Sequence, residues 1–266
     1  MKYWRKIFVW AVFIALIGIF ILPKIDTNSR NMDLYNENCY LEIYKNRIIL
    51  YNDKKEKIDT YTLKEKIKAY SIGDIDGNGL DELVVLTKDS FKKYGKDVVA
   101  FSLEGDIKEI CREDFSRLNP WKIALGDIDG DGKKEVSVGV YKKAPFHQVL
   151  AKRPFIYSYE NHRLNPKWRG SRLSRPFTDY NFCDIDGDGI DEIISIEILE
   201  NEEKVINTYK WEGFGFTGFL ESESYKDIKN LTIKEGRIYF DIKDKGGIYT
   251  GQLKFKDNNL KIERVE

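Results

Sequence analysis

The sequence predicts an all-β fold made of repeated four-stranded antiparallel units. One acidic loop occurs three times among the 266 residues, starting at Asp74, Asp127 and Asp184. The starts are 127 − 74 = 53 and 184 − 127 = 57 residues apart. Each period repeats the same order: a short strand, the loop, a buried strand, then one or two aromatic-rich strands. A repeat of this length and order is typical of the blades of a β-propeller.

The strands are expected in the following order. Before the first loop, residues 39–44, 47–51 and 58–63 alternate apolar and polar side chains, and they supply either a further blade or the strands that close the ring. After the loops, buried strands are expected at 83–86, 136–140 and 194–198, and the second period also has strands at 121–126 and 154–159. The tail is expected to form one degenerate blade from residues 230–233, 237–242, 248–255 and 260–265. Five blades are the preferred count, with four as the alternative.

Each acidic loop has the ligand pattern of a hard cation such as Ca²⁺. Oxygen-bearing residues stand at positions 1, 3, 5 and 9, and a glycine at position 6 permits the sharp turn. An EF-hand would need a bidentate glutamate at position 12 and a following helix. Position 12 is instead Val85, Val138 or Ser195, and a strand pattern follows. The loops are therefore not EF-hands.

On these loops the chain resembles the FG-GAP/VCBS repeat family, over residues 68–224 in particular. The resemblance implies calcium-binding propeller blades, usually extracellular and engaged in adhesion or ligand binding. It places Ca²⁺ ligands on the following residues: Asp74, Asp76, Asn78 and Glu82; Asp127, Asp129, Asp131 and Glu135; Asp184, Asp186, Asp188 and Glu192. Position 9 is glutamate here, where aspartate is commoner in the family. Asn78 removes one charge, so the first site is expected to bind most weakly.

The same Asx-Gly sequences also form tight turns without any metal. A filled loop would brace the corner of a blade and perform no chemistry.

The N-terminus predicts a membrane tether. Residues 7–22 carry no charge, follow Lys2, Arg5 and Lys6, and precede Pro23. At about 1.5 Å per residue this run is short for a membrane core of about 30 Å, so it is either a short signal anchor or a long signal peptide. No cleavage site of the A-x-A type follows. We expect a single-pass signal anchor at 1–23, a linker at 24–38 and a propeller at 39–266 on the extracytoplasmic side, secreted if the segment is cleaved.

Local charge suggests a binding face. Formal net charge is zero, with 44 basic and 44 acidic residues, so global charge indicates no partner. Residues 141–175 carry nine lysines and arginines against one acid, Glu160, together with both histidines, and a loop is expected to project at 144–153. Arginine and aromatic side chains suit carboxylates, phosphates and sugars. We expect one exposed ligand-binding face made of Arg153, Trp168, Arg172 and Arg175.

Neither the three cysteines nor a search for catalytic motifs indicates a chemical activity. Cys183 occupies the position of Gly73 and Gly126 before the loop and is expected to be a small buried residue, while a Cys39–Cys111 disulfide is an alternative for the other two. No catalytic motif and no cofactor-binding motif occurs.

The sequence thus favours a membrane-anchored calcium-binding propeller that binds a protein or an anionic surface polymer or glycan, without nucleic acid. The alternative is a cell-surface carbohydrate-active enzyme, a hydrolase or lyase, for which Glu160 and Asp179 are the acids nearest the basic segment.

Overall fold

The computed structural model describes residues 28–34, 37–170 and 172–265, and the side chains from Cys39 onward. Its strands form five four-stranded antiparallel sheets, each built from four consecutive strands. This confirms the all-β class and the four-stranded antiparallel unit, and it agrees with the preferred count of five. The described residues contain one short 3₁₀ helix, Ser116–Leu118, and no helix long and apolar enough to cross a membrane.

The bounds of the strands follow the expected order closely. The first sheet contains β1 (Asn28–Leu34), β2 (Glu37–Ile43), β3 (Arg47–Tyr51) and β4 (Lys57–Thr62), and the second contains β5 (Lys66–Gly73), β6 (Glu82–Lys88), β7 (Asp97–Ser102) and β8 (Lys108–Asp114). The third contains β9 (Pro120–Gly126), β10 (Glu135–Ala144), β11 (His147–Glu160) and β12 (Arg163–Trp168), and the fourth contains β13 (Phe177–Cys183), β14 (Glu192–Ile198), β15 (Lys204–Trp211) and β16 (Phe216–Glu221). The fifth contains β17 (Asp227–Lys234), β18 (Arg237–Asp244), β19 (Gly247–Lys256) and β20 (Asn259–Arg264).

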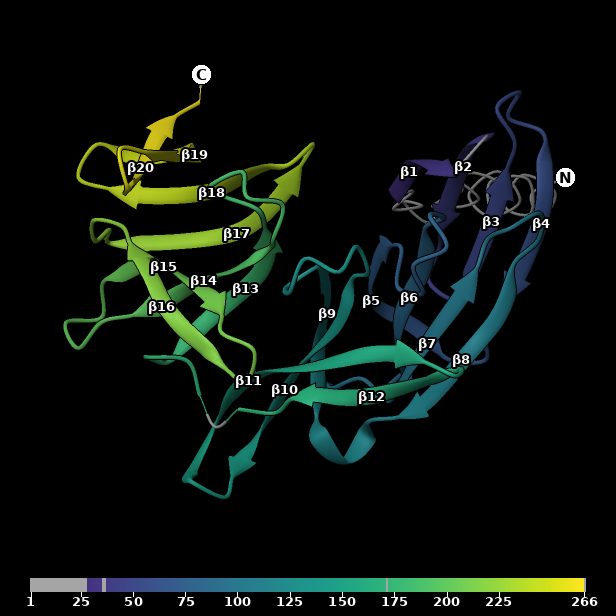
Figure 1. The fold of residues 1–266 in the computed structure, drawn as a ribbon, viewed down its shortest axis with the longest axis horizontal. Coiled ribbons are helices and arrows are strands. Elements are labelled where there is room, and N and C mark those ends of the chain that lie inside the picture. The colour runs from purple at the N-terminus through teal and green to yellow at the C-terminus, as the bar shows by residue number, and fades with distance from the viewer. Residues whose placement is uncertain (1–27, 35–36, 171, 266) are drawn as a thin grey trace, which may run out of the picture.

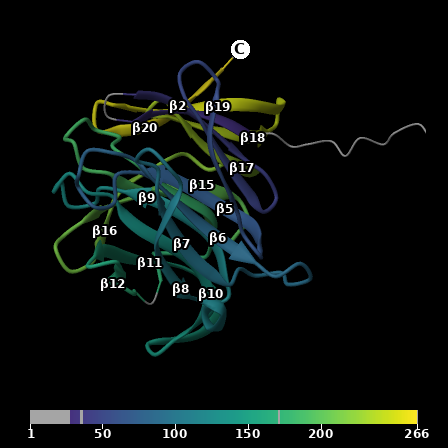
Figure 2. The ribbon, with the colours of Figure 1, turned by 90° about the vertical axis from the view of Figure 1, so that its right-hand side faces the viewer.

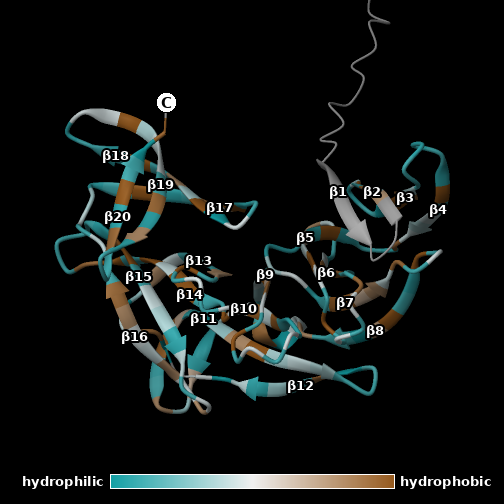
Figure 3. Cartoon of the chain, turned by 45° about the horizontal axis from the view of Figure 1, so that its top comes forward, coloured by the Kyte–Doolittle hydropathy of each residue, from teal (hydrophilic) through white to brown (hydrophobic). Residues whose placement is uncertain are grey.

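The sheets follow one another around an arc in chain order (Figure 1). The first strands of successive sheets lie side by side, so that β5 contacts β9, β9 contacts β13 and β13 contacts β17. The fourth strands lie towards the outside of the arc, and the same arrangement is visible when the molecule is tilted (Figure 3). Each acidic loop joins the first strand of a sheet to its second strand.

Four hydrophobic cores lie between consecutive sheets. Within β6, Leu83 and Val85 pack in the core shared with the first sheet, whereas Val84 and Leu86 pack in the core shared with the third. Alternate side chains of a strand point to opposite faces, so a strand sandwiched between two neighbours must be apolar on both. This explains the continuous apolar run at 83–86. Among the described side chains, no core cluster contains residues of both the first and the fifth sheet.

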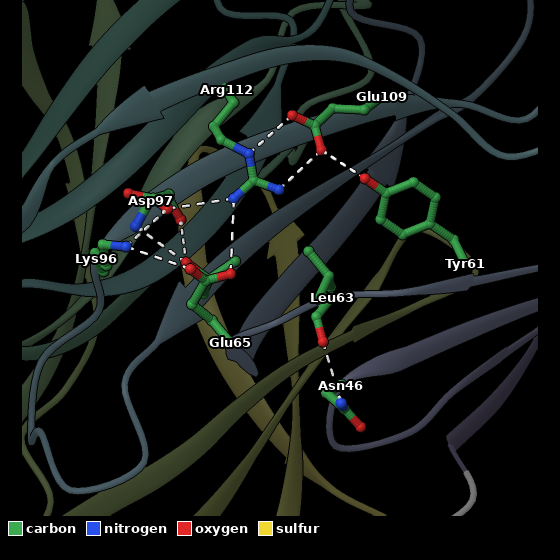
Figure 4. Close-up of polar contacts among 9 residues, drawn as sticks. Asn46, Tyr61, Leu63, Glu65, Lys96, Asp97, Glu109 and Arg112 are labelled. Carbon is green, nitrogen blue, oxygen red and sulfur yellow. Dashed lines mark hydrogen bonds and ion pairs between the residues drawn. The ribbon is translucent and has the colours of Figure 1, made fainter.

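Polar contacts also join the sheets (Figure 4). The Arg112 guanidinium donates two hydrogen bonds of 2.8 Å to Glu109 and one of 3.2 Å to Asp97, all within the second sheet. Tyr61, on β4 of the first sheet, donates a hydrogen bond of 2.8 Å to Glu109. Asp59 of the same strand accepts a 2.9 Å hydrogen bond from the backbone of Ile107. The outer strands of the first two sheets are thus held together by charged and backbone hydrogen bonds.

Three expectations differ from the structure or fall outside it. The expected linker at 24–38 contains the strand Asn28–Leu34, which pairs with β2 across the chain from Asn28↔Ile43 to Leu34↔Glu37. The loop expected at 144–153 is mostly strand, because β10 and β11 pair almost to the turn and form a long hairpin that projects from the third sheet (Figure 2). The expected signal anchor at 1–23 lies outside the described residues.

No disulfide joins the three cysteines. Cys39 packs in the core between the first two sheets, and Cys111 packs in the next core, so the alternative of a Cys39–Cys111 bridge is not adopted. Cys183 is buried as expected, and burial raises the pKa of its thiol, like that of Cys111, to about 11. Both thiols are therefore protonated and unreactive at neutral pH.

Replacing Leu86 by alanine should destabilise the protein by about 3 kcal/mol. Its side chain is fully buried in the core between the second and third sheets, so truncation removes apolar contacts and leaves a cavity. Chemical unfolding of the purified protein measures the difference. Phe214→Ala is the matched control, because Phe214 is 87% exposed and its loss should change stability by about 0.5 kcal/mol or less. Equal effects of the two substitutions would contradict the assigned core.

Candidate metal centre

Each acidic loop is folded by hydrogen bonds from its own backbone. The aspartate at position 1 accepts hydrogen bonds from the glycine amides at positions 4 and 6, at 2.7 Å and 2.9 Å in all three copies. Position 5 accepts from the amide of position 7, at 2.7 Å from Asn78 and at 2.9 Å from Asp131 and Asp188. The glycines at positions 4 and 6 have φ between +72° and +86°, where a side chain would be strained. The sequence therefore specifies the turn without a metal.

The glutamate at position 9 is the unusual member of each loop. Glu82, Glu135 and Glu192 begin the second strands of their sheets and are 1%, 3% and 1% exposed. One carboxylate oxygen of each accepts a hydrogen bond of 3.0–3.1 Å from the amide of position 2. Burial raises the pKa of Glu82 and Glu192 to about 7, and it also raises that of Glu135. A buried carboxylate of this kind is stable as an anion only if a cation lies beside it.

Three carboxylates converge in every loop. Ligand atoms of positions 1, 3 and 9 lie within 4.8 Å of one another, so each loop has an acidic group that could hold a metal ion. These groups are Asp74, Asp76 and Glu82; Asp127, Asp129 and Glu135; Asp184, Asp186 and Glu192. Asp131 and Asp188 at position 5 lie outside the groups. The structure thus brings the carboxylates of positions 1, 3 and 9 together, while one oxygen of position 5 accepts the amide of position 7.

Lysine side chains enter two of the three groups. The ammonium of Lys167, on β12, contacts Asp129 and lies 2.6 Å from Glu135. The ammonium of Lys210, on β15, lies 2.7 Å from both Asp186 and Asp188 and 3.3 Å from Glu192. Although burial opposes the charge of both lysines, hydrogen bonds to these carboxylates raise the pKa of each.

The first loop has no such lysine. Among the described residues, no lysine or arginine forms an ion pair with Asp74, Asp76 or Glu82. The neighbouring charges that act on Glu82 are the aspartates at positions 74, 76 and 81, and all of them raise its pKa. The three loops therefore share one backbone and differ in the charge that faces the buried glutamate.

The donor set fits a hard divalent cation. All converging atoms are carboxylate oxygens, the ligands that Ca²⁺ and Mg²⁺ prefer. In the third loop, Oδ1 of Asp186 is buried and accepts no hydrogen bond, whereas Oε1 of Glu192 has the ammonium of Lys210 3.3 Å away. Unsatisfied buried acceptors are rare, so the Asp186 oxygen is a position at which a cation could bind.

The acidic loops also hold neighbouring sheets together. Position 8 of one loop donates its backbone amide to the carbonyl oxygen of position 1 of the preceding loop, from Lys134 to Asp74 and from Asp191 to Asp127, both at 2.7 Å. Position 7 packs on the position 4 glycine of the preceding loop, so a Cβ on Gly77 would clash with Lys133 at 2.7 Å. These contacts and the two lysines were not predicted. The regular placement of the loops at 53- and 57-residue intervals was the signal that could have suggested contacts between them.

The expected binding face is only partly present. Arg153 is fully buried, and its guanidinium donates hydrogen bonds to the carbonyl oxygens of Lys142, His147 and Val149. It therefore cannot belong to an exposed face, because these hydrogen bonds hold its guanidinium against the backbone of the hairpin. Trp168 is half-buried against Phe216. Arg172 is exposed, and Arg175 is paired with Glu221.

Arg172 and Arg175 do share a cavity. It has a volume of about 360 Å³ and lies between the β10–β11 hairpin and residues 172–177, with His147 on its wall. The two acids considered for catalysis do not come together: Glu160 borders a cavity beside the second acidic loop, whereas Asp179 borders a cavity between the inner strands and is paired with Lys122.

The sequence was compared with family models and with curated proteins, and neither comparison found a match.

The stability of the metal-free protein should fall as pH rises from about 4.5 to about 7. Glu82 and Glu192 have folded-state pKa values of about 7 against about 4.5 when unfolded, so the folded state binds more protons within this window. The stabilisation from these protons is complete below the unfolded value and is lost as pH passes the folded value. Unfolding curves in chelator at several pH values test this, and Glu82→Gln should flatten the slope. An identical slope in wild type and variant would contradict the buried, uncompensated state of Glu82.

Proposed function

We propose that the chain is a Ca²⁺-binding, five-bladed β-propeller that works as a binding or adhesion module outside the cytoplasm. The observation that carries the proposal is the series of three acidic loops, each with a buried glutamate facing two aspartates, in which the first loop is bonded to the second and the second to the third. Such loops brace the corners between blades. The resemblance to FG-GAP/VCBS repeats supports the same interpretation.

The inner strands support a propeller. A cavity of about 600 Å³ is lined by Ile43 to Lys45 of the first sheet, by β5 and β9, and by Asp179 and Asn181 of β13. Residues of four successive sheets thus face one central space, as the inner strands of propeller blades do. The fifth sheet continues the series through the contact of β17 with β13.

Ca²⁺ suits the loops better than Mg²⁺. Ca²⁺ accepts six to eight oxygens at about 2.3–2.6 Å in flexible geometry, whereas Mg²⁺ demands a near-octahedral shell and keeps several waters. Three carboxylates together with backbone carbonyls and water would satisfy Ca²⁺. An extracytoplasmic protein would also meet Ca²⁺ at concentrations that fill sites of modest affinity.

The first loop is the principal site in this proposal. A cation that enters the second or third loop must displace the ammonium of Lys167 or Lys210, whereas in the first loop it meets uncompensated carboxylates. The loss of one charge at Asn78 matters less, because the side-chain oxygen of Asn78 already accepts the amide of Leu80 at 2.7 Å. The proposed order of affinity is thus the reverse of the one expected from charge alone, in which the first loop is weakest.

One tightly bound Ca²⁺ per chain is expected, and Lys210→Met should raise the number to two. Equilibrium dialysis counts the ions, and Glu82→Gln should remove the tight site. Binding to the folded state alone should also stabilise the protein by about 3 kcal/mol at a hundredfold excess over Kd, measured as a higher melting temperature. Lys256→Met, which changes an exposed lysine of the fifth sheet, is the control. No bound Ca²⁺ would mean that the loops are plain turns, and three equal sites would contradict the role of the lysines.

For the membrane tether and the binding partner, the proposal keeps what the sequence predicts. Residues 1–23 would anchor the chain in the membrane, or leave it secreted if cleaved, with the propeller on the extracytoplasmic side. The partner would be a protein or an anionic surface polymer or glycan. Arg172 would contact it at the mouth of the cavity beside the hairpin, where Phe146, Val149 and Leu150 are also exposed.

Binding of an anionic surface polymer should weaken with salt and with Arg172→Ala. Exposed charges are screened beyond a Debye length of about 8 Å at physiological ionic strength, and loss of an arginine at an interface costs about 2 kcal/mol. A pull-down with isolated cell-wall polymers at low and high salt measures both effects. Arg163→Ala, an exposed arginine at the start of β12, is the matched control. Binding that is insensitive to salt and to Arg172→Ala would exclude this face as the contact.

A carbohydrate-active enzyme is the second candidate, and no observation favours it. Glu160 and Asp179 border separate cavities, so they do not form the pair of facing carboxylates that glycoside hydrolysis uses.

A further inference from the structure

The cavity between the inner strands is lined by lysines from three different sheets. Lys45 lies in the turn between β2 and β3, Lys68 on β5 and Lys122 on β9, and all three border the space of about 600 Å³. The turn that carries Lys45 is bonded to β5, because the amide of Ile67 donates a 2.6 Å hydrogen bond to the carbonyl oxygen of Lys45. The fold therefore gathers positive charges that lie up to 77 residues apart in the sequence (122 − 45).

Further lysines lie near residues of the cavity wall. Lys152, on β11, places its ammonium 4.0 Å from the ring centroid of Trp121, whose side chain belongs to the cavity wall. The pKa of Lys68 is lowered by burial and by Lys88 and Lys93, and that of Lys66 by burial and by Lys45 and Lys88. Burial lowers the pKa of Lys152, Asp179 opposes this, and the lysines at positions 122, 204 and 93 lower the pKa further. Each of the three wall lysines thus has a further lysine near enough to repel it or to be repelled by it: Lys66 for Lys45, Lys88 and Lys93 for Lys68, and Lys152 for Lys122.

Little negative charge compensates them. Asp179 is the one acid among the residues that line the cavity, and it is already paired with Lys122. Crowded like charges destabilise a folded protein unless a ligand neutralises them. The arrangement therefore has a cost to stability that a bound anion would remove.

We propose that this central cavity binds a compact polyanion, a ligand with several closely spaced oxyanion groups. The proposal rests on the binding role proposed above and assigns it a second place in the molecule, separate from the Arg172 face. Lysine ammonium groups suit such ligands because each is a mobile point charge with three donors, able to contact sulfate, phosphate or carboxylate oxygens. A single small anion would neutralise only part of a cluster that spans three sheets.

Sucrose octasulfate is the probe, and inorganic sulfate is the single-anion comparison. Calorimetric titration of the full-length protein, at a fixed excess of Ca²⁺, should show binding of the polyanion that weakens with added salt and much weaker binding of sulfate. Lys45→Gln combined with Lys68→Gln should lower the affinity at least tenfold. Lys45→Arg with Lys68→Arg keeps the charge and should retain most of the affinity.

Asp179→Asn should change the affinity for the polyanion in the opposite direction. It removes the one acid on the cavity wall, so the affinity for the polyanion should rise severalfold, which a merely damaged fold would not produce. Lys256→Gln, far along the fifth sheet, should leave the affinity unchanged. The proposal is overturned if the wild type binds no polyanion at physiological salt, or if the Lys45 and Lys68 double glutamine variant binds as tightly as wild type.

The two binding proposals fail separately in these experiments. Loss of polymer binding in Arg172→Ala with intact octasulfate binding would support both sites. Octasulfate binding that depends on Arg172 and not on Lys45 and Lys68 would overturn the central site and leave the hairpin face. Absence of Ca²⁺ binding would affect the proposed metal role alone.

Discussion

The architecture depends on a buried carboxylate at the start of the second strand in three of its five sheets. Glu82, Glu135 and Glu192 each accept the backbone amide of position 2 and thereby fix the loop against the strand. The second and third loops each donate a backbone amide to a carbonyl oxygen of the preceding loop, which fixes the spacing between their sheets. A glutamate in this place is unfavourable as an anion unless a cation accompanies it. Each of the three loops therefore needs a cation beside its buried glutamate.

The chain meets this requirement in two ways. In the second and third loops the cation is covalently part of the protein, as Lys167 and Lys210. In the first loop no described side chain supplies it, which is the basis for assigning the site to Ca²⁺. A lysine pays side-chain entropy but works at any metal concentration, whereas a metal site makes stability depend on the surroundings. The first loop joins β5 to β6 of the second sheet. It is thus the place where the Ca²⁺ concentration of the surroundings would change the stability of the fold.

Much of the fold could be predicted from the sequence because strand alternation and loop repetition are local signals. The expected strand at 121–126 corresponds to Pro120–Gly126, and the tail strands correspond to β17 to β20. The site was predicted down to positions 1, 3 and 9 for the same reason. Lys167 and Lys210 could not be predicted, because they come from β12 in one sheet and β15 in another and reach their loops only through tertiary packing. Arg153 was misjudged because its burial depends on how the hairpin turn folds back over its side chain.

The most direct test of this account is hydrogen exchange of the three loops, followed by mass spectrometry with and without Ca²⁺. The backbone amides of positions 4, 6 and 7 donate hydrogen bonds to side chains of their own loop. Their exchange rates therefore report on each loop separately. The account predicts that Ca²⁺ slows exchange strongly in residues 74–82 and little in 127–135 and 184–192, where lysines already compensate the carboxylates. Equal protection of all three loops, or none in the first, would contradict it.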